Sequence, residues 1–182
     1  MPQEYVPAAL QAIIVMGVSG CGKSSVGEAL ASRLGSPFIE GDGLHPASNV
    51  EKMAEGTPLT DEDRWPWLGV IGERMADALS RGEGIVVSCS ALKKIYRDHL
   101  RAATGGRLAF VYLEGSRDLL NQRMGARTGH FMPLGLLESQ LATLEVPTGE
   151  AGVLTVSIDQ TLGAIVSEAL DGLTQQATPD RG

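Results

Sequence analysis

The sequence lacks the features that mark secreted, membrane-spanning or nucleic-acid-binding proteins. It holds only two cysteines among 182 residues, Cys21 and Cys89, which form neither a disulfide framework nor a metal-ligand spacing. Apolar runs such as 12–16 are far shorter than the ~20 residues that a membrane span requires. The net charge is −7, whereas a nucleic-acid-binding surface usually shows a basic surplus. We therefore expect reduced thiols in a cytoplasmic protein that binds neither membrane nor nucleic acid.

What the sequence does contain is a regular alternation of short apolar runs, rich in β-branched residues, with helical patterns. Strands are expected at 12–16, 37–40, 85–90, 108–113 and 153–158. Helices are expected at 22–35, 48–56, 91–102, 116–127, 134–145 and 161–173, with a further helical stretch from Asp61. Strands separated by helices pair in parallel through right-handed crossovers. The prediction is an α/β fold, a three-layer α/β/α sandwich around a five-stranded parallel sheet.

Two of the expected helices carry signals at their first turns. Ser48 is expected to cap the helix at 48–56, with Glu51 completing a capping box. Pro66 is expected in the first turn of a longer helix that runs to about Arg81. The whole chain, 1–182, is of the size of one domain, with a core at about 12–173 and loose ends at 1–10 and 174–182. The first ten residues also lack the basic segment of a signal peptide.

A phosphate-binding motif follows the first expected strand. The segment GVSGCGKS at 17–24 matches G-x-x-x-x-G-K-[ST] in full. Its glycines let the backbone N–H groups curl around phosphate oxygens, its lysine supplies a positive charge, and its serine hydroxyl faces Mg²⁺. We therefore predict that ATP and Mg²⁺ bind here. The residues expected to hold the nucleotide are Gly17, Val18, Ser19, Gly20, Cys21, Gly22, Lys23, Ser24 and Ser25.

The rest of the sequence narrows the class of nucleotide-binding protein. A GTPase switch requires a guanine-reading N-K-x-D segment, and the chain has none. A motor-type ATPase ends its third strand in an aspartate, whereas this strand ends in Ser88, Cys89 and Ser90. A carboxylate for the metal must then come from elsewhere, and Glu40 and Asp42 are the nearest candidates beside Ser24. This pattern favours a small-molecule kinase.

The segment EGDGLHP at 40–46 supplies candidate acceptor-side residues. A kinase needs a carboxylate near the attacking hydroxyl, and Asp42 lies two residues beyond the second expected strand. We expect Asp42 to orient and deprotonate the acceptor, with His45 beside it. The alternative is that both residues only shape an Asx-type turn into the next helix.

Basic residues in two further segments are candidates for binding an anionic substrate. Arg64 follows three acids at a helix start, where a cation opposes the helix dipole unless it has another partner. Lys93, Arg97 and Arg101 fall at i, i+4 and i+8 of the next helix. A solvated face is expected for Arg101, and anion binding by Lys93 and Arg97 is at least as well supported. Leu92, Ile95, Tyr96 and His99 are expected on the inward side.

A pair of arginines marks an expected lid at about 123–133. Arg123 and Arg127 lie one helical turn apart, with glycines around them that loosen the backbone and His130 near the tip. Such a pair suits an element that closes over a triphosphate and stabilises charge during transfer, which makes Arg127 a catalytic candidate beside Lys23 and Asp42. The alternative is a salt-bridged surface helix.

Seven segments occur in the order seen in the bacterial-type gluconokinases, and the chain resembles that family over about residues 12–170. They are MGVSGCGKS, GDGLHP, NVEKMAEGTPLTDEDRWPWL, CSALKKIYRD, YLEG, ARTGHF and LATLEVP. The resemblance implies a P-loop fold like that of shikimate and nucleoside-monophosphate kinases. It also implies phosphorylation of D-gluconate at the 6-hydroxyl by ATP with Mg²⁺, in a cytoplasmic homodimer.

The resemblance assigns provisional roles to the candidate residues. Asp42 would orient the 6-hydroxyl, while the other hydroxyls and the carboxylate would be held by His45 with some of Arg64, Lys93, Arg97 and His130. Arg123 and Arg127 would close over ATP, and Asp159 and Gln160 would flank the adenine. Family members often carry aspartate at the position of Glu40, so the residue at this candidate metal position departs from the family pattern.

Two other functions remain open at this point. The chain could phosphorylate another polyol acid, or shikimate, on the same fold. It could also be a non-catalytic regulator that binds nucleotide, although a pure switch requires neither the acceptor segment nor the lid arginines.

Overall fold

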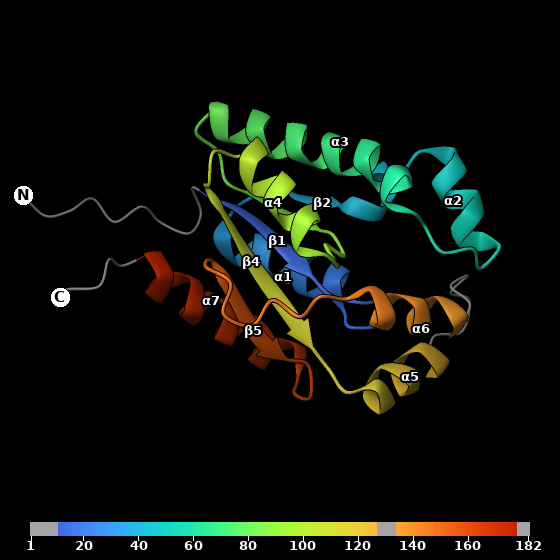
Figure 1. Ribbon diagram of the computed structural model, residues 1–182. Helices are drawn as coiled ribbons and strands as arrows, with labels where there is room; N and C mark the ends of the chain where they lie inside the picture. The colour runs from blue at the N-terminus through green and yellow to red at the C-terminus, as the bar shows by residue number, and fades with distance from the viewer. Residues whose placement is uncertain (1–10, 127–133, 178–182) are drawn as a thin grey trace, which may run out of the picture.

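The computed structural model of the chain describes residues 11–126 and 134–177, and within them it forms one parallel sheet (Figure 1). The strand order is β2-β3-β1-β4-β5, and every neighbouring pair is parallel. The strands are β1 (Ala12–Met16), β2 (Phe38–Glu40), β3 (Ile85–Ser88), β4 (Leu108–Glu114) and β5 (Val153–Ser157). The predicted five-stranded parallel sheet is confirmed.

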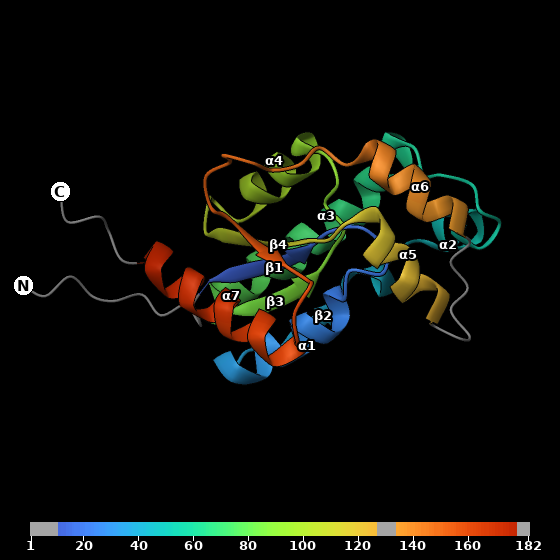
Figure 2. The ribbon, with the colours of Figure 1, turned by 90° about the horizontal axis from the view of Figure 1, so that it is seen from below.

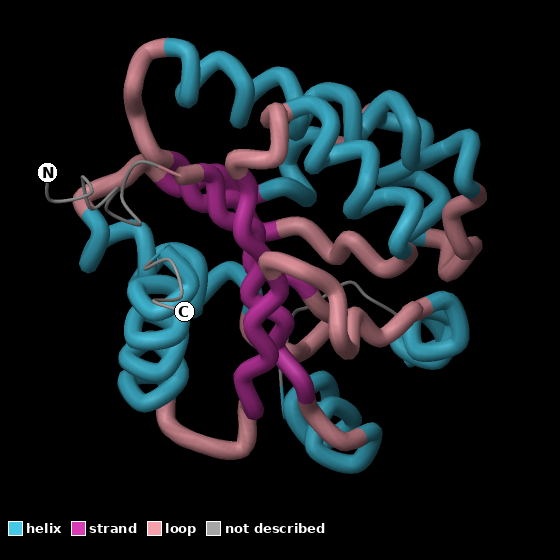
Figure 3. The backbone as a smooth tube through the Cα atoms, turned by 60° about the vertical axis from the view of Figure 1, so that its left-hand side comes forward, coloured by secondary structure: helices cyan, strands magenta, loops and turns pink. Residues whose placement is uncertain are grey.

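Helices cover both faces of the sheet and form the outer layers of an α/β/α sandwich (Figures 1 and 2). They are α1 (Lys23–Leu34), α2 (Ala47–Ala54), α3 (Asp61–Ser80), α4 (Lys94–Ala103), α5 (Arg117–Ala126), α6 (Leu134–Thr143) and α7 (Leu162–Ala177). α1 and α7 lie on one face, and α3 and α4 lie on the other, with the strands between them (Figure 3). α2, α5 and α6 lie beyond the carboxyl ends of the strands. None of the helices described is both long and apolar enough to span a bilayer.

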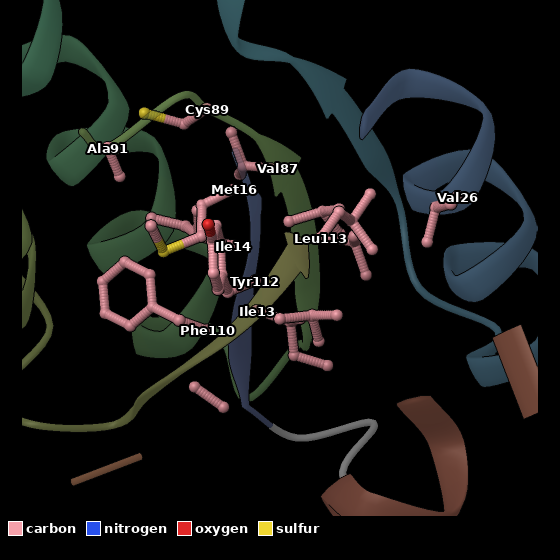
Figure 4. Packing of buried hydrophobic residues seen from close by; sticks show 14 of the residues in the cluster. Ile13, Ile14, Met16, Val26, Val87, Cys89, Ala91, Phe110, Tyr112 and Leu113 are labelled. Carbon is pink, nitrogen blue, oxygen red and sulfur yellow. The ribbon is translucent and has the colours of Figure 1, made fainter. Parts of the chain in front are cut away.

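The core is built around β1, the central strand, whose five residues are all buried. Ile14, Met16 and Phe110 extend toward α3 and α4, whereas Ile13 and Leu113 extend toward α1 (Figure 4). A strand buried on both faces reads as a continuous apolar run, which is why the sequence showed no alternation there. The phosphate-binding motif therefore starts at the carboxyl end of the most deeply buried strand.

The capping signals differ from those expected. α2 begins at Ala47 directly after Pro46, without a side-chain cap, so Ser48 already lies in the first turn and cannot be the N-cap. The capping box forms instead at α3, where Thr60 accepts from the Asp63 N–H and Asp63 accepts from the Thr60 N–H. α3 is one continuous helix with Pro66 inside it, not a short stretch followed by a second helix.

The helix after β3 was predicted wrongly at its start and for part of its inward face. α4 begins at Lys94 rather than Ala91, because the chain leaves β3 with Ala91 in a left-handed conformation (φ 47°). The inward face is formed by Tyr96, Arg97 and Leu100, while Ile95 and His99 are exposed. The predicted inward face was therefore right for Leu92 and Tyr96, which are buried, and wrong for Ile95 and His99.

Candidate active site

The loop between β1 and α1 has the geometry of a phosphate cradle. Gly17, Gly20 and Gly22 all have positive φ, at 143°, 85° and 94°. A Cβ on Gly17 would lie 2.8 Å from Cys21 Sγ, so the loop is too tight for a side chain there. α1 has neither a side-chain cap nor an acidic residue in its first turn. No acidic side chain therefore neutralises the positive N-terminal end of α1, which leaves this end available to a phosphate.

Helix α6 contacts this loop through Gln140. The Gln140 Oε1 accepts from the Ser19 backbone N–H at 2.8 Å and from the Ser19 hydroxyl at 3.0 Å. On the other side, the Lys23 Nζ donates to the Val18 carbonyl at 3.2 Å. The phosphate loop is thus held against an element more than a hundred residues away in the sequence.

A pocket opens beside the phosphate loop, and besides Ser19 of that loop it gathers four of the predicted site residues. Lys23, Asp42, His45 and Arg64 all line it. They come from α1, from the short 3-10 helix η2 (Gly41–Leu44), from the residue after it, and from α3. An acid, a histidine and two cations from separate parts of the sequence therefore face one cavity next to the expected γ-phosphate.

Asp42 is placed by the tight contact between β2 and β3. The Gly41 N–H donates to Ser88 Oγ at 3.2 Å, and Trp67 Nε1 donates to the Gly41 carbonyl at 2.8 Å. The turn is closed by the backbone, with the His45 N–H donating to the Asp42 carbonyl at 3.3 Å. This leaves the Asp42 carboxylate, which is half exposed, to face the pocket.

Gly41 has no room for a side chain, so we expect Gly41→Ala to damage both stability and activity. The added Cβ would lie 1.9 Å from the Ser88 carbonyl oxygen, and backbone there must shift. Overpacking of this kind costs about 1–3 kcal/mol or more, which lowers Tm by roughly 2–12 °C. Gly43→Ala is the matched control, because a Cβ on Gly43 meets nothing within 4 Å. Calorimetry that gave both variants the same Tm would contradict the predicted clash.

His45 lies between Trp67 and Asn49. Its ring stacks on the indole of Trp67 with centroids 4.0 Å apart and planes 17° apart. Its Nδ1 lies 3.1 Å from Asn49 Nδ2, and its Nε2 lies 4.0 Å from Asp42 Oδ1. Burial lowers the pKa of His45 from 6.5 to about 4, against the opposing effect of the Asp42 charge. His45 is therefore neutral near pH 7.

The lowered pKa of His45 predicts a pH-dependent loss of stability. Between pH 6.5 and about 4 the unfolded chain binds a proton at His45 that the native protein does not, so stability falls as pH falls through this window. His45→Gln should remove this part of the pH dependence, so the stability gap between the two proteins narrows toward pH 4. Urea unfolding from pH 4 to 8 measures it, with exposed His99→Gln as the control. A constant gap across that range would contradict the prediction.

Arg64 is a buried cation that faces the pocket. It is 8% exposed, and the ion pairs formed among the described residues do not include it. Its Nη1 donates to Tyr96 Oη at 2.9 Å, and its guanidinium lies 5.3 Å from the Tyr96 ring centre. A buried positive charge without a direct carboxylate partner is costly, which makes Arg64 a candidate for binding an anionic group.

Lys93 differs from Arg64 because it already has an acidic partner. Its Nζ donates to Asp61 Oδ1 at 3.0 Å, and Tyr96 Oη donates to the same oxygen. Hydrogen bonds from Tyr96 and Lys93 lower the pKa of Asp61, and the Asp61 bond raises the pKa of Lys93. Lys93 is not among the residues that line the pocket. Through Asp61, Lys93 is linked to Tyr96, and Tyr96 accepts from Arg64.

The expectation that Arg97 binds substrate is corrected by its surroundings. Arg97 is fully buried, and its Nη2 and Nε donate to the Glu150 carboxylate at 2.6 and 3.0 Å. The same guanidinium donates to the carbonyls of Ala91, Leu92 and Glu145. Its donors are occupied by the protein itself, so Arg97 is a structural residue.

The predicted nucleotide-side residues lie around the end of β5. Arg123 Nη2 donates to the Ile158 carbonyl at 2.7 Å, and Arg123 Nη1 lies 4.0 Å from where a Gly22 Cβ would be. Arg123 therefore lies between the phosphate loop and the segment that carries Asp159 and Gln160. Gln160 donates to Glu168 at 2.8 Å. Arg127 and His130 fall outside the described residues.

The oxygen donors near the phosphate loop fit Mg²⁺, which takes one or two protein oxygens and completes its shell with phosphates and water. The Ser24 hydroxyl at the start of α1 and the Asp42 carboxylate are hard ligands of this kind. Glu40 Oε1 accepts from the Ser88 hydroxyl at 2.9 Å, so one of its oxygens is already engaged. In the described part of the chain, no group of three or more His, Cys, Asp or Glu could hold a metal alone.

Several residues at the site were missed by sequence reasoning. They are Trp67, Asn49, Ser139 and Gln140, none of which was predicted to belong to the site. A signal was present for α6, because Leu136, Ser139 and Gln140 fall at i, i+3 and i+4 and share one helix face. Nothing local in the sequence indicated which partner that face would meet.

The fold and the site together define a class of protein. A phosphate cradle at the carboxyl end of the central parallel strand suits a nucleoside triphosphate, and a pocket beside it presents a carboxylate and a buried cation. This is the arrangement of a P-loop kinase that acts on a small acceptor.

Comparison with known proteins places the chain within that class. A family model described as an AAA domain matches residues 13–147. The gluconokinase of Gluconobacter oxydans strain 621H is 47% identical over 158 residues, covering 87% of this chain and 88% of that protein. The thermoresistant gluconokinase of Escherichia coli K12 is 44% identical over 160 residues, covering 87% and 90%. A crystal structure of a gluconokinase from Sinorhizobium meliloti 1021 aligns with a TM-score of 0.86 and 59% identity, covering 92% of this chain and 94% of that one. The chain belongs to the gluconokinase family, which confirms the resemblance drawn from its sequence.

Proposed function

We propose that this protein transfers the γ-phosphoryl group of ATP to the 6-hydroxyl of D-gluconate, giving 6-phospho-D-gluconate and ADP. The observation that carries the proposal is the pocket that holds Lys23, Asp42 and Arg64 together. Asp42 can accept the proton of a hydroxyl beside the phosphate loop. Arg64 can bind a carboxylate elsewhere on the same substrate. The relatives named gluconokinase, at 47% and 44% identity, support the same acceptor.

In the proposed reaction the acceptor oxygen attacks the γ-phosphorus in line with the leaving ADP. The new bond joins that oxygen to phosphorus, the bond to the β–γ bridging oxygen breaks, and the hydroxyl proton passes to Asp42. Lys23 neutralises charge on the β- and γ-phosphates, a role that Arg123 and Arg127 would share from the lid. Mg²⁺, held by Ser24 and Asp42 with Glu40 nearby, would further neutralise the phosphates when bound.

The substrate would extend from Asp42 toward Arg64. Arg64 would hold the gluconate carboxylate, and His45 and His130 would contact its hydroxyls. Lys93 would act on the substrate only through Asp61 and Tyr96, because its ammonium is already paired. Asp159 and Gln160 would flank the adenine at the end of β5.

A coupled assay of ADP release with several acceptors tests this function. Gluconate, shikimate and other aldonates are supplied separately at equal concentration, with ATP and Mg²⁺ and with an acceptor-free control. We expect gluconate to give the highest kcat/KM and shikimate to give no more than the control. A higher kcat/KM with shikimate or another acid would replace gluconate as the acceptor. ADP release that no acceptor raises above the control would favour a nucleotide-binding regulator.

We also propose that the chain, 1–182, is one kinase domain that works in the cytoplasm as a homodimer. Both cysteines are buried free thiols, which suits a reducing compartment where ATP is available. Light scattering of the purified protein measures the assembly, and a monomeric mass would contradict the dimer.

A further inference from the structure

Asn49, at the start of α2, is a buried residue whose amide hydrogens are both used. It is 1% exposed, and its Nδ2 donates to the Asp63 carbonyl at 2.8 Å. The same Nδ2 lies 3.1 Å from His45 Nδ1. An amide nitrogen carries hydrogens and accepts none, so His45 Nδ1 must present its lone pair. The single N–H of the neutral His45 ring is then on Nε2.

The direction of that N–H is fixed by the residues around the ring. His45 stacks on Trp67, and Trp67 is held in turn by its Nε1 bond to the Gly41 carbonyl at 2.8 Å. The charged groups that face the ring are Asp42, near Nε2, and Arg64. The ring can therefore neither flip nor tilt freely, and Nε2–H points into the same region as the Asp42 carboxylate.

His45 Nε2 and Asp42 Oδ1 are 4.0 Å apart, which is too far for a direct hydrogen bond. One oxygen atom can nevertheless lie about 2.8 Å from both. Such an oxygen accepts from Nε2–H and donates to the carboxylate, and a hydroxyl group does both. A carboxylate or carbonyl oxygen cannot donate to Asp42, so the pair discriminates against an acid or an aldehyde at this place.

We propose that Asn49 is a positioning residue that holds His45 as the Nε2–H tautomer, so that His45 and Asp42 together select an acceptor hydroxyl. The selection step rests on the proposed function, because the hydroxyl is that of the phosphoryl acceptor. The tautomer step does not, since it concerns the protein without substrate.

Nitrogen-15 NMR of the histidine rings tests the tautomer directly. The wild-type protein should show His45 protonated at Nε2 and not at Nδ1. Asn49→Asp should reverse this, because a carboxylate accepts a hydrogen from Nδ1, and Asn49→Ala should give a mixture. An Nδ1–H tautomer in the wild type would overturn the proposal, and this measurement needs no variant to fold.

Kinetics then show whether Asn49 positions His45 or only links α2 to α3. We expect Asn49→Asp to lower kcat/KM for gluconate about tenfold to a hundredfold, and Asn49→Ala somewhat less, with the KM for ATP unchanged. Lys52→Met is the matched control, because Lys52 also joins α2 to Asp63, at 2.8 Å, without contacting His45. It should leave both the tautomer and kcat/KM as in the wild type. An equal loss in Lys52→Met would show that Asn49 acts only as a tether.

Binding of 6-deoxygluconate, compared with gluconate by calorimetry, tests the selection of a hydroxyl. The wild type should bind the deoxy compound about tenfold more weakly, because the donor and the acceptor are both left without a partner. In Asn49→Asp this difference should shrink to less than about threefold. An undiminished difference would overturn the selective role, and binding of neither compound would reject the proposed function while leaving the tautomer result intact.

Discussion

Replacing Asp42 by asparagine should lower kcat by about 10²–10⁴-fold, because the amide cannot take the proton of the attacking hydroxyl. Asparagine keeps the size of the side chain, and the turn around it is closed by backbone groups. The fold and the phosphate loop should therefore be preserved. The affinity for ATP, measured by fluorescence or calorimetry, is expected to change less than about threefold, within the range of a weak charge effect.

The matched control for this substitution is Asp77→Asn. Asp77 lies on α3 in an exposed ion pair with Arg81, away from the pocket, so its kcat should equal that of the wild type. If Asp42→Asn turned over at the wild-type rate, Asp42 would have no part in proton transfer. If ATP affinity fell as strongly as kcat, the main role of Asp42 would be in holding the nucleotide and its metal.

The sequence was most informative where function depends on backbone geometry. The glycines of 17–22 require a tight loop with positive φ, and the apolar run before them requires a buried strand. These local requirements predict both the phosphate cradle and its place at the sheet edge. The remaining strands followed in the same way, since each is a short apolar run between helices.

Contacts between distant segments could not be predicted in this way. Gln140 meets Ser19 across more than a hundred residues, and Asn49 donates to the carbonyl of Asp63, 14 residues away on α3. Neither residue type suggests its role by itself, since both glutamine and asparagine are also common on solvated faces. Such roles depend on tertiary packing, which a pattern of residue types does not encode.

Arg97 shows the same limitation in the opposite direction. A cation at helical spacing from other cations predicts a solvated or anion-binding stripe, and Arg101, 23% exposed, fits that pattern in part. Arg97 lies on the inward side because Glu150, from the segment after α6, neutralises it there. Charge alone therefore misplaced a residue whose partner is 53 residues away.

The second large effect is expected from Arg97→Met, which should lower the free energy of unfolding by about 3–5 kcal/mol. Methionine fills much of the same volume but donates no hydrogen bonds. Glu150 would lose its main partner, and the buried carbonyls of Ala91, Leu92 and Glu145 would lose a donor. For a protein of this size the loss corresponds to a Tm lower by roughly 6–20 °C.

Arg101→Met separates this effect from a loss of surface charge. Arg101 pairs with the same Glu150 at 2.9 Å but lies at the partly exposed edge, so its removal should cost about 0–1 kcal/mol. Urea unfolding of both variants, followed by circular dichroism, measures the difference. Equal losses would mean that Arg97 contributes only its charge to Glu150. A larger loss for Arg97→Met would show that its hydrogen bonds hold the loop after β3 in place. Ser90 of that loop lines the pocket. The KM for the acceptor should therefore rise in Arg97→Met and not in Arg101→Met.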